Sequence, residues 1–124
     1  MKLRIRANTL RLRLTRAEVA SIENGHTVAE ETQFPDGSVM RYEMVPGAHD
    51  DAALTTRDGA LVLRVEVPAD RARAWAGDET EVGLYGEEAH AVGPLAVLIE
   101  KDFTCLAPRA GEEELDTFPN PNAA

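Results

Sequence analysis

The alternation of apolar and polar residues predicts short strands at the start of the chain. Lys2 to Leu14 alternates with a period of two, which places leucine and isoleucine on one side and arginine on the other. We interpret the segment as a hairpin that turns at Ala7-Asn8, although one long bent strand would show the same alternation. Leu95 to Ile99 is an unbroken apolar run, typical of a strand covered on both faces. We expect it to be the central strand.

Turn residues between alternating segments predict the other strands. The predicted pairs are His26 to Phe34 with Val39 to Val45, Ala53 to Arg57 with Ala60 to Val67, and Thr80 to Tyr85 with Leu95 to Lys101. Asp58-Gly59 favours a two-residue hairpin loop, because both central positions of a type I′ turn need positive φ. The side chains expected to face the core are Val28, Phe34, Met40, Tyr42 and Met44. Leu61, Leu63, Val65 and Val67 are expected to share one face of their strand.

Two helices are predicted from capping and stop signals. Thr15 and Glu18 match a capping box, in which each side chain satisfies a free amide at a helix start. The helix that follows should run from Arg16 to Glu23 and bury Val19, Ala20 and Ile22. A second helix is expected over Ala69 to Ala76, with Trp75 as its main apolar contact and a glycine directly after it.

These elements together predict an α+β fold of about eight mostly antiparallel strands, forming a sheet or a partly open barrel with two helices. Leu10 to Thr15 leads into a helix ending at Gly25, and Leu63 to Pro68 leads into one ending at Gly77. The order strand, strand, helix, strand, strand would then occur twice. Ordinary α+β patterning without a true repeat is the alternative.

Length and composition fit one small domain. A chain of 124 residues with 44% apolar residues can bury a core without disulfides, and its single cysteine fits a reducing compartment. Arginines interrupt the apolar residues of the first segment, so we predict no signal peptide, no membrane contact and a cytoplasmic location. We expect one domain over residues 1–124, with a core at 1–106 and an acidic, proline-containing tail at 107–124 that docks on the core.

Charge is distributed unevenly along a chain of net charge −9. Residues 1–16 carry six cationic side chains and no acid, whereas residues 76–124 carry eleven acids against Lys101 and Arg109. We expect the two oppositely charged ends to contact each other. A basic face that receives a phosphate or nucleic acid is the alternative, and we predict no nucleic-acid partner.

A search for catalytic and metal-binding motifs gives few candidates. The chain has no glycine-rich phosphate loop, nucleophile elbow, His-x-x-x-His pair or Cys-x-x-Cys pair. His26, His49, His90 and Cys105 would bind zinc only if the fold brought them together, so we predict no metal and no cofactor. Cys105 is expected to be a small buried apolar residue rather than a nucleophile.

Glu100 and Asp102 lie two residues apart and should share one face of a strand. Two carboxylates placed in this way can chelate a cation, raise each other's pKa or form ion pairs with arginines. Of these three alternatives we expect the ion pairs. The candidate binding residues are therefore Arg4, Arg6, Arg11, Arg13, Glu100, Asp102, Cys105 and Arg109.

The two ends of the chain resemble a family of small bacterial proteins of unknown function. The ending matches as Glu100 to Phe103, Cys105-Leu106, Arg109, the acids Glu112 to Glu114 with Asp116, and Phe118 to Pro121, and the opening K-L-R-I-R-x-N-T-L-R-L-R-L-T is also similar. The resemblance implies that the tail belongs to the domain. It implies no catalytic or binding residue.

Two classes of function fit these observations. The first is a small non-enzymatic binding or accessory module that engages another protein or a second copy of itself. The second is an anion-binding domain or hydrolase-like enzyme that uses the Arg-rich first strands with Glu100, Asp102 or Cys105. We favour the first class, because it requires no catalytic side chains to converge.

Overall fold

The computed structural model describes residues 1–102 of the chain. Two helices and eight strands follow one another in this part, which confirms the α+β class. The strands and helices are β1 Lys2–Arg6, β2 Thr9–Leu14, α1 Arg16–Glu23, β3 Val28–Gln33, β4 Val39–Gly47, β5 Asp51–Arg57, β6 Ala60–Pro68, α2 Ala69–Gly77, β7 His90–Val92 and β8 Leu95–Lys101.

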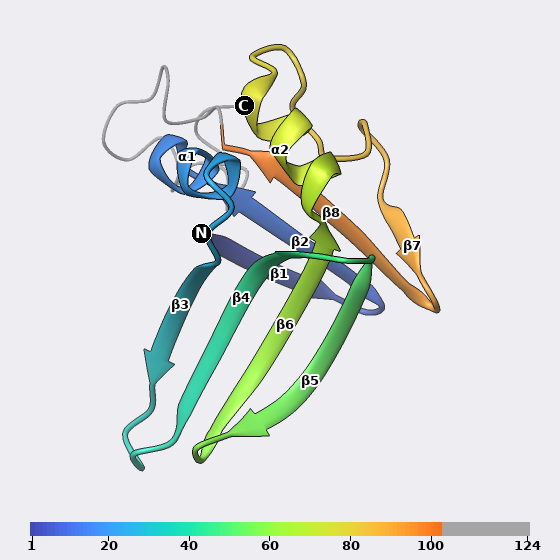
Figure 1. Cartoon of the computed structure of the whole chain (residues 1–124). Helices are drawn as coiled ribbons and strands as arrows, with labels where there is room; N and C mark the ends of the chain where they lie inside the picture. Colours follow the sequence, from blue (N-terminus) through green and yellow to red (C-terminus); the bar gives the residue numbers. More distant parts are fainter. Residues whose placement is uncertain (103–124) are drawn as a thin grey trace, which may run out of the picture.

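The strands form two four-stranded sheets (Figure 1). The first sheet has the order β1-β2-β8-β7, and the second has the order β3-β4-β6-β5. The two inner strands of each sheet run parallel, β2 with β8 and β4 with β6, while the outer pairs are antiparallel. The sequence predicted either one sheet or a partly open barrel. The described strands instead form two separate mixed sheets.

The strand order also supports the predicted internal repeat. Each half of the chain contributes one hairpin before its helix and one after it. The hairpin before the helix pairs with the hairpin after the helix of the other half, so that β2 meets β8 and β6 meets β4. Each sheet therefore contains one hairpin from each half of the chain. The two sheets have the same arrangement, with the roles of the two halves reversed.

Local signals account for the predicted turns and the first helix. Ala7 and Asp58 have positive φ angles of 49° and 52° at the tips of the β1–β2 and β5–β6 hairpins, and Gly59 has one of 83°. The Thr15 hydroxyl accepts a hydrogen bond from the Glu18 amide, and the Glu18 carboxylate accepts one from the Thr15 amide. The capping box is thus confirmed.

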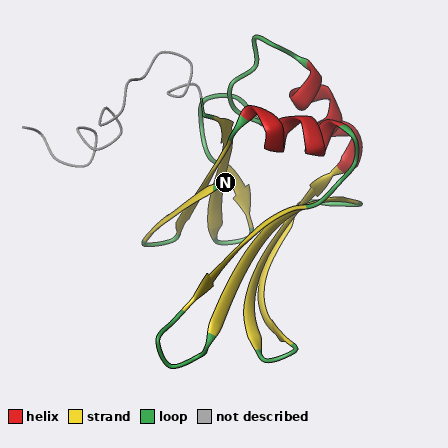
Figure 2. Cartoon of the chain, turned by 90° about the vertical axis from the view of Figure 1, so that its left-hand side faces the viewer, coloured by secondary structure: helices red, strands yellow, loops and turns green. Residues whose placement is uncertain are grey.

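The helices lie together at one end of the two sheets, which splay apart from that end (Figure 2). Trp75 of α2 is completely buried, and its indole nitrogen donates to the Val82 carbonyl oxygen at 2.9 Å. Side chains from both helices and both sheets form one core, as expected from an apolar face on each element. The core includes Leu10, Leu12, Leu14, Val19, Ile22, Val28, Met44, Leu63, Val65, Val67, Ala72, Trp75, Leu84, Val97 and Ile99.

The predicted strand from Thr80 to Tyr85 is wrong. The chain touches β8 only around Gly83, which forms an isolated bridge with Glu100, and then turns back so that the Gly86 amide donates to the Gly83 carbonyl oxygen. A side chain at Gly83 would lie 1.9 Å from that neighbouring backbone oxygen of Gly86, so the turn requires glycine. β7 instead forms at His90–Val92, inside the segment predicted to be a connection.

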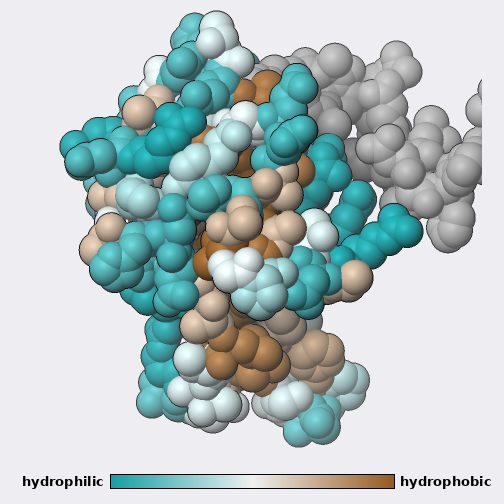
Figure 3. Space-filling view, turned by 90° about the vertical axis from the view of Figure 1, so that its right-hand side faces the viewer, coloured by the Kyte–Doolittle hydropathy of each residue, from teal (hydrophilic) through white to brown (hydrophobic). Residues whose placement is uncertain are grey.

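Several side chains expected in the core are exposed. Ala20 lies on the solvent side of α1, and Phe34 is 46% exposed. Leu61, on the same face of β6 as the buried Leu63, is 41% exposed. The second sheet extends beyond the first on the side away from the helices, so the far end of its inner face has no covering layer (Figure 1). Hydrophobic surface is visible on this projecting end in Figure 3, and Leu54 of β5 is 62% exposed.

Candidate functional site

Five cationic side chains lie on one face of the β1–β2 hairpin. Strand alternation places them on the side of the first sheet opposite the core, and the register sets Lys2 beside Arg13 and Arg4 beside Arg11. We call this surface, with the two carboxylates described below, the cationic face. Its cations are Lys2, Arg4, Arg6, Arg11 and Arg13.

Glu100 of β8 binds two of these arginines. Its Oε1 atom accepts hydrogen bonds from the Nε atoms of Arg11 at 2.7 Å and Arg13 at 2.8 Å. Burial alone would raise the pKa of Glu100, but the hydrogen bonds from Arg13 and Arg11 outweigh it and lower the pKa below its ordinary value. Glu100 is therefore a carboxylate at neutral pH, and it offsets one of the two positive charges in the inner part of the face.

Asp102 closes the end of the cationic face. Its carboxylate lies 3.4 Å from the Lys2 ammonium, and its amide donates to the Leu14 carbonyl oxygen at 2.9 Å. Asp102 is only 8% exposed, so its carboxylate is held at this end of the face. The expected ion pairs of Glu100 and Asp102 are both present.

Arg4 and Arg6 occupy the outer part of this face on the edge strand β1. Both side chains are exposed, and within residues 1–102 no carboxylate forms an ion pair with either of them. The face thus holds five cations against two carboxylates, an excess of three positive charges in a chain of net charge −9.

The corresponding face of the second sheet carries no excess of positive charge. Glu43 is 4% exposed and accepts hydrogen bonds from the Arg57 Nη2 atom at 2.8 Å and the Arg41 Nε atom at 3.0 Å. Arg64 lies 3.3 Å from Glu66, and Arg41 also lies 3.4 Å from Glu31. Three arginines and three glutamates are paired there, so the excess charge is specific to the first sheet.

Six of the eight predicted binding residues therefore lie on one face. They are Arg4, Arg6, Arg11, Arg13, Glu100 and Asp102. Cys105 and Arg109, like the rest of the predicted tail, lie outside the described residues.

A second polar cluster joins the Ala48–Asp50 connection to the segment around β7. The Tyr85 hydroxyl donates to the Asp50 carboxylate at 2.7 Å, and the His90 Nε2 atom lies 3.3 Å from the same carboxylate. The rings of Tyr85 and His90 stack with centroids 4.0 Å apart, and the Arg71 guanidinium lies over the Tyr85 ring. Sequence patterns did not predict this cluster, because two strands and a helix separate Asp50 from the other residues along the chain.

Burial and the neighbouring carboxylate keep Tyr85 protonated. Burial and, next, the hydrogen bond to Asp50 together raise its pKa to about 12. The hollow beside the cluster measures only about 10 Å³, which is less than a substrate needs. The arrangement therefore ties the Asp50 connection to the sheet edge and does not form an open reaction site.

The other histidines lie apart from this cluster on the surface. His26 is exposed after α1, and His49 is exposed in the β4–β5 connection, where its amide donates to Glu66. Across residues 1–102, no three histidine, cysteine or acidic side chains are grouped closely enough to hold a metal ion.

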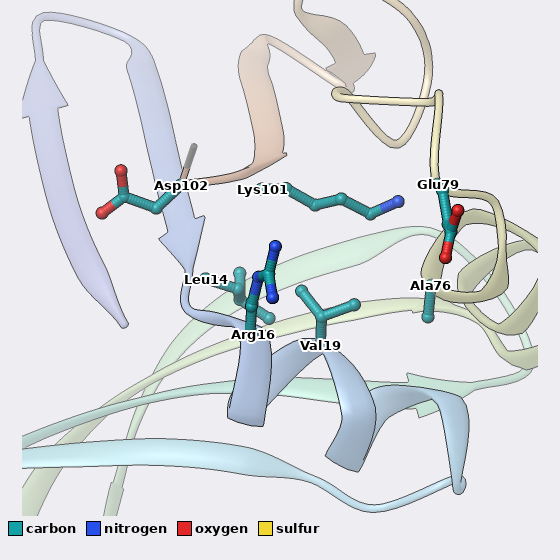
Figure 4. A pocket seen from close by; sticks show the side chains of 7 residues that line it. All are labelled: Leu14, Arg16, Val19, Ala76, Glu79, Lys101 and Asp102. Carbon is teal, nitrogen blue, oxygen red and sulfur yellow. The ribbon is translucent and has the colours of Figure 1, made fainter. Parts of the chain in front are cut away.

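A pocket of about 370 Å³ opens between the helices and the ends of β2 and β8 (Figure 4). Its apolar lining comes from Leu14, Val19 and Ala76. Charged side chains of both signs surround it, with Lys101 extended across the opening and Asp102 turned the other way, toward β1 and β2. The pocket and the cationic face thus meet where the described chain ends.

The match to known families covers almost the whole chain. A model of a family of unknown function, DUF7009, matches residues 1–122. The chain belongs to this family. Searches of curated proteins and of solved structures found no match to this DUF7009 protein. In the described part of the chain, neither helix is long and apolar enough to cross a membrane.

Proposed function

We propose that this DUF7009 protein is a non-enzymatic binding module whose cationic face binds an acidic segment of another protein. One observation carries the proposal. Arg4 and Arg6 are exposed side by side on β1 without a carboxylate partner among residues 1–102, on a face with an excess of positive charge. Charge of this kind attracts anionic groups and fixes their orientation.

An acidic peptide fits this surface better than a nucleic acid. The strand positions on the outer side of the first sheet offer no aromatic ring for base stacking, since the uncharged ones nearest the arginines are Thr9, Ala96 and Leu98. The net charge of −9 would also repel a long polyanion that extends past the hairpin. A short acidic segment contacts only the local positive charge.

The enzyme alternative has weaker support from the same residues. Glu100 is held by two arginines with a lowered pKa, so it is a poor proton donor near neutral pH. Location in the bacterial cytoplasm stays a prediction from composition and resemblance.

The proposal is tested with a fluorescent oligoglutamate peptide, titrated against the full-length protein at low ionic strength. Binding should weaken several-fold in Arg4→Glu and Arg6→Glu and should decline as salt is added. Arg73→Glu is the matched control, because Arg73 is exposed on α2, away from the cationic face, and the change in net charge is the same.

Equal losses in the Arg4 and Arg73 variants would show that only net charge matters. Absence of peptide binding in every variant would also refute the proposal. So would tighter binding of a single-stranded oligonucleotide than of the peptide, if Arg4→Glu abolished it.

A further inference from the structure

We infer that the acidic tail of this chain, residues 107–124, occupies the cationic face in cis and competes there with the acidic partner. The inference rests on the proposed function and names a regulator of the same surface. The competing segment carries Glu112, Glu113, Glu114 and Asp116, which are the charges that an acidic ligand would present.

The point at which the described chain ends favours this contact. Asp102 is itself part of the cationic face, 3.4 Å from the Lys2 ammonium, and its amide is fixed to Leu14 of β2. The described chain therefore ends at the edge of the surface that the tail would cover. In Figure 4 the Asp102 side chain points toward β1 and β2, away from the pocket.

The length of the tail is sufficient. Glu112 follows Asp102 by ten residues, and an extended chain spans about 3.3 Å per residue, so the acids can reach roughly 33 Å from their origin. The five-residue strand β1, which carries Arg4 and Arg6, is about half as long. A tethered segment of this kind acts at an effective concentration of the order of millimolar.

Charge complementarity selects the same segment. Among the described residues, Glu100 and Asp102 leave the excess positive charge of the face in place, whereas Glu31, Glu43 and Glu66 of the second sheet already have arginine partners. Ion pairs in water are individually weak, so a tail held by a few of them remains displaceable by a better acidic ligand. An acidic partner would therefore have to bind the cationic face tightly enough to displace the tail.

The test removes charge from the tail without shortening the chain. In the full-length triple variant Glu112→Gln, Glu113→Gln and Glu114→Gln, the oligoglutamate peptide should bind roughly fivefold more tightly than to the wild type at low salt. The gain should disappear at high salt. The matched control is the triple variant Asp70→Asn, Glu87→Gln and Glu88→Gln, which changes net charge equally at exposed positions elsewhere.

A second measurement separates this inference from the proposed function. In nuclear magnetic resonance spectra without peptide, the Arg4 and Arg6 signals should shift in the tail variant and remain in place in the control. If they do not shift, or if both triple variants gain equally in peptide affinity, cis docking is refuted. If the wild type and the tail variant instead bind the peptide equally, with binding still reduced by Arg4→Glu, that result would support the proposed binding function and refute regulation by the tail. If the Arg4 and Arg6 signals shift but no variant binds the peptide, the contact with the tail is supported and the proposed binding of an acidic partner is refuted.

Discussion

Glu43 shows how a single carboxylate can be buried on a face that no other element covers. The arginine side chains of β4 and β5 shield it, and it is 4% exposed. Burial alone would raise its pKa, but hydrogen bonds from Arg57 and Arg41 outweigh this and lower the pKa below the ordinary 4.5. Because the folded-state pKa is lowered, the stabilisation is present above pH 4.5 and is lost as pH falls below it.

We therefore expect Glu43→Gln to lower the free energy of unfolding by about 1–2 kcal/mol at neutral pH, since two arginines lose their counter-charge. Urea denaturation measures the loss, which should shrink in acid as the wild-type carboxylate is protonated. Glu31→Gln is the control, because Glu31 pairs with the same Arg41 through a half-exposed side chain. Equal losses in both variants would contradict a special role for burial.

The pKa of Tyr85 is raised by folding, whereas that of Glu43 is lowered. Its folded-state pKa of about 12 exceeds the ordinary value of 10.0, so its contribution to stability is complete below pH 10.0 and is lost as pH rises toward 12. Tyr85→Phe should cost about 1 kcal/mol below that range through the lost hydrogen bond to Asp50, and little above it.

Ultraviolet absorbance of tyrosinate follows the titration directly, and thermal unfolding at several pH values follows the stability. Tyr42→Phe removes the other tyrosine and isolates the Tyr85 signal, because the chain has only two. A midpoint near 10.0 for the remaining tyrosine would show that Tyr85 is not held by Asp50 in solution.

At the scale of the elements, the β1–β2 hairpin contains an avoidable strain. Ala7 has a φ of +49° at its tip, in the left-handed region that glycine adopts more easily than alanine. Ala7→Gly should stabilise the protein by up to about 1 kcal/mol, as measured by urea denaturation. Thr9→Gly, two residues further on in regular strand, is expected to destabilise it. Loss of stability in Ala7→Gly would show that the turn relaxes in solution.

Elements with signals close together in sequence were predictable. The capping box, the Asp58-Gly59 loop and the alternation along β2 each act within a few residues. β7 was missed because its position depends on the tight approach of Gly83 to Gly86, which becomes evident only in three dimensions. Phe34 was placed in the core because alternation shows which side of a strand is apolar, and does not show where the covering layer ends.

The candidate site follows the same division. Arginines at every second position of one hairpin had to share a face, and two acids spaced by two near the end of β8 could be expected beside them. The parallel pairing of β2 with β8 brings Glu100 to Arg13 across most of the chain, and no local pattern encodes it. The Asp50, Tyr85 and His90 cluster depends on contacts of this long-range kind.

At the scale of the whole molecule, the pocket between the helices gives a prediction for Cys105. The pocket opens beside Asp102, three residues before the only thiol, and its lining is partly apolar. We expect the segment after Asp102 to pack in this pocket, and a thiol reagent should then label native Cys105 slowly. Ala76→Arg, which fills the pocket, should speed labelling at least several-fold, whereas Ala74→Arg on the exposed side of the same helix should not. Rapid labelling of the wild type would contradict this packing.

The exchange of strands between the halves makes the protein tolerant of one particular cut. A protease site inserted in the connection at residues 48–50 separates the halves covalently, but each sheet still contains strands from both. The cleaved protein should elute as one species in gel filtration, with a melting temperature close to that of the uncut insertion variant. Separation of the two pieces under native conditions would contradict the interlocked arrangement.

The same exchange bears on the ancestry of the fold. Two copies of a half-length chain, related by a two-fold axis, would assemble the same two sheets and the same helix pair. Joining such copies end to end converts a symmetric homodimer into a single chain whose halves are free to diverge. The outer faces of the two sheets differ: charges are paired on the second sheet, whereas Arg4 and Arg6 on the first have no carboxylate partner among residues 1–102. Duplication thus gives one scaffold two surfaces that evolve separately.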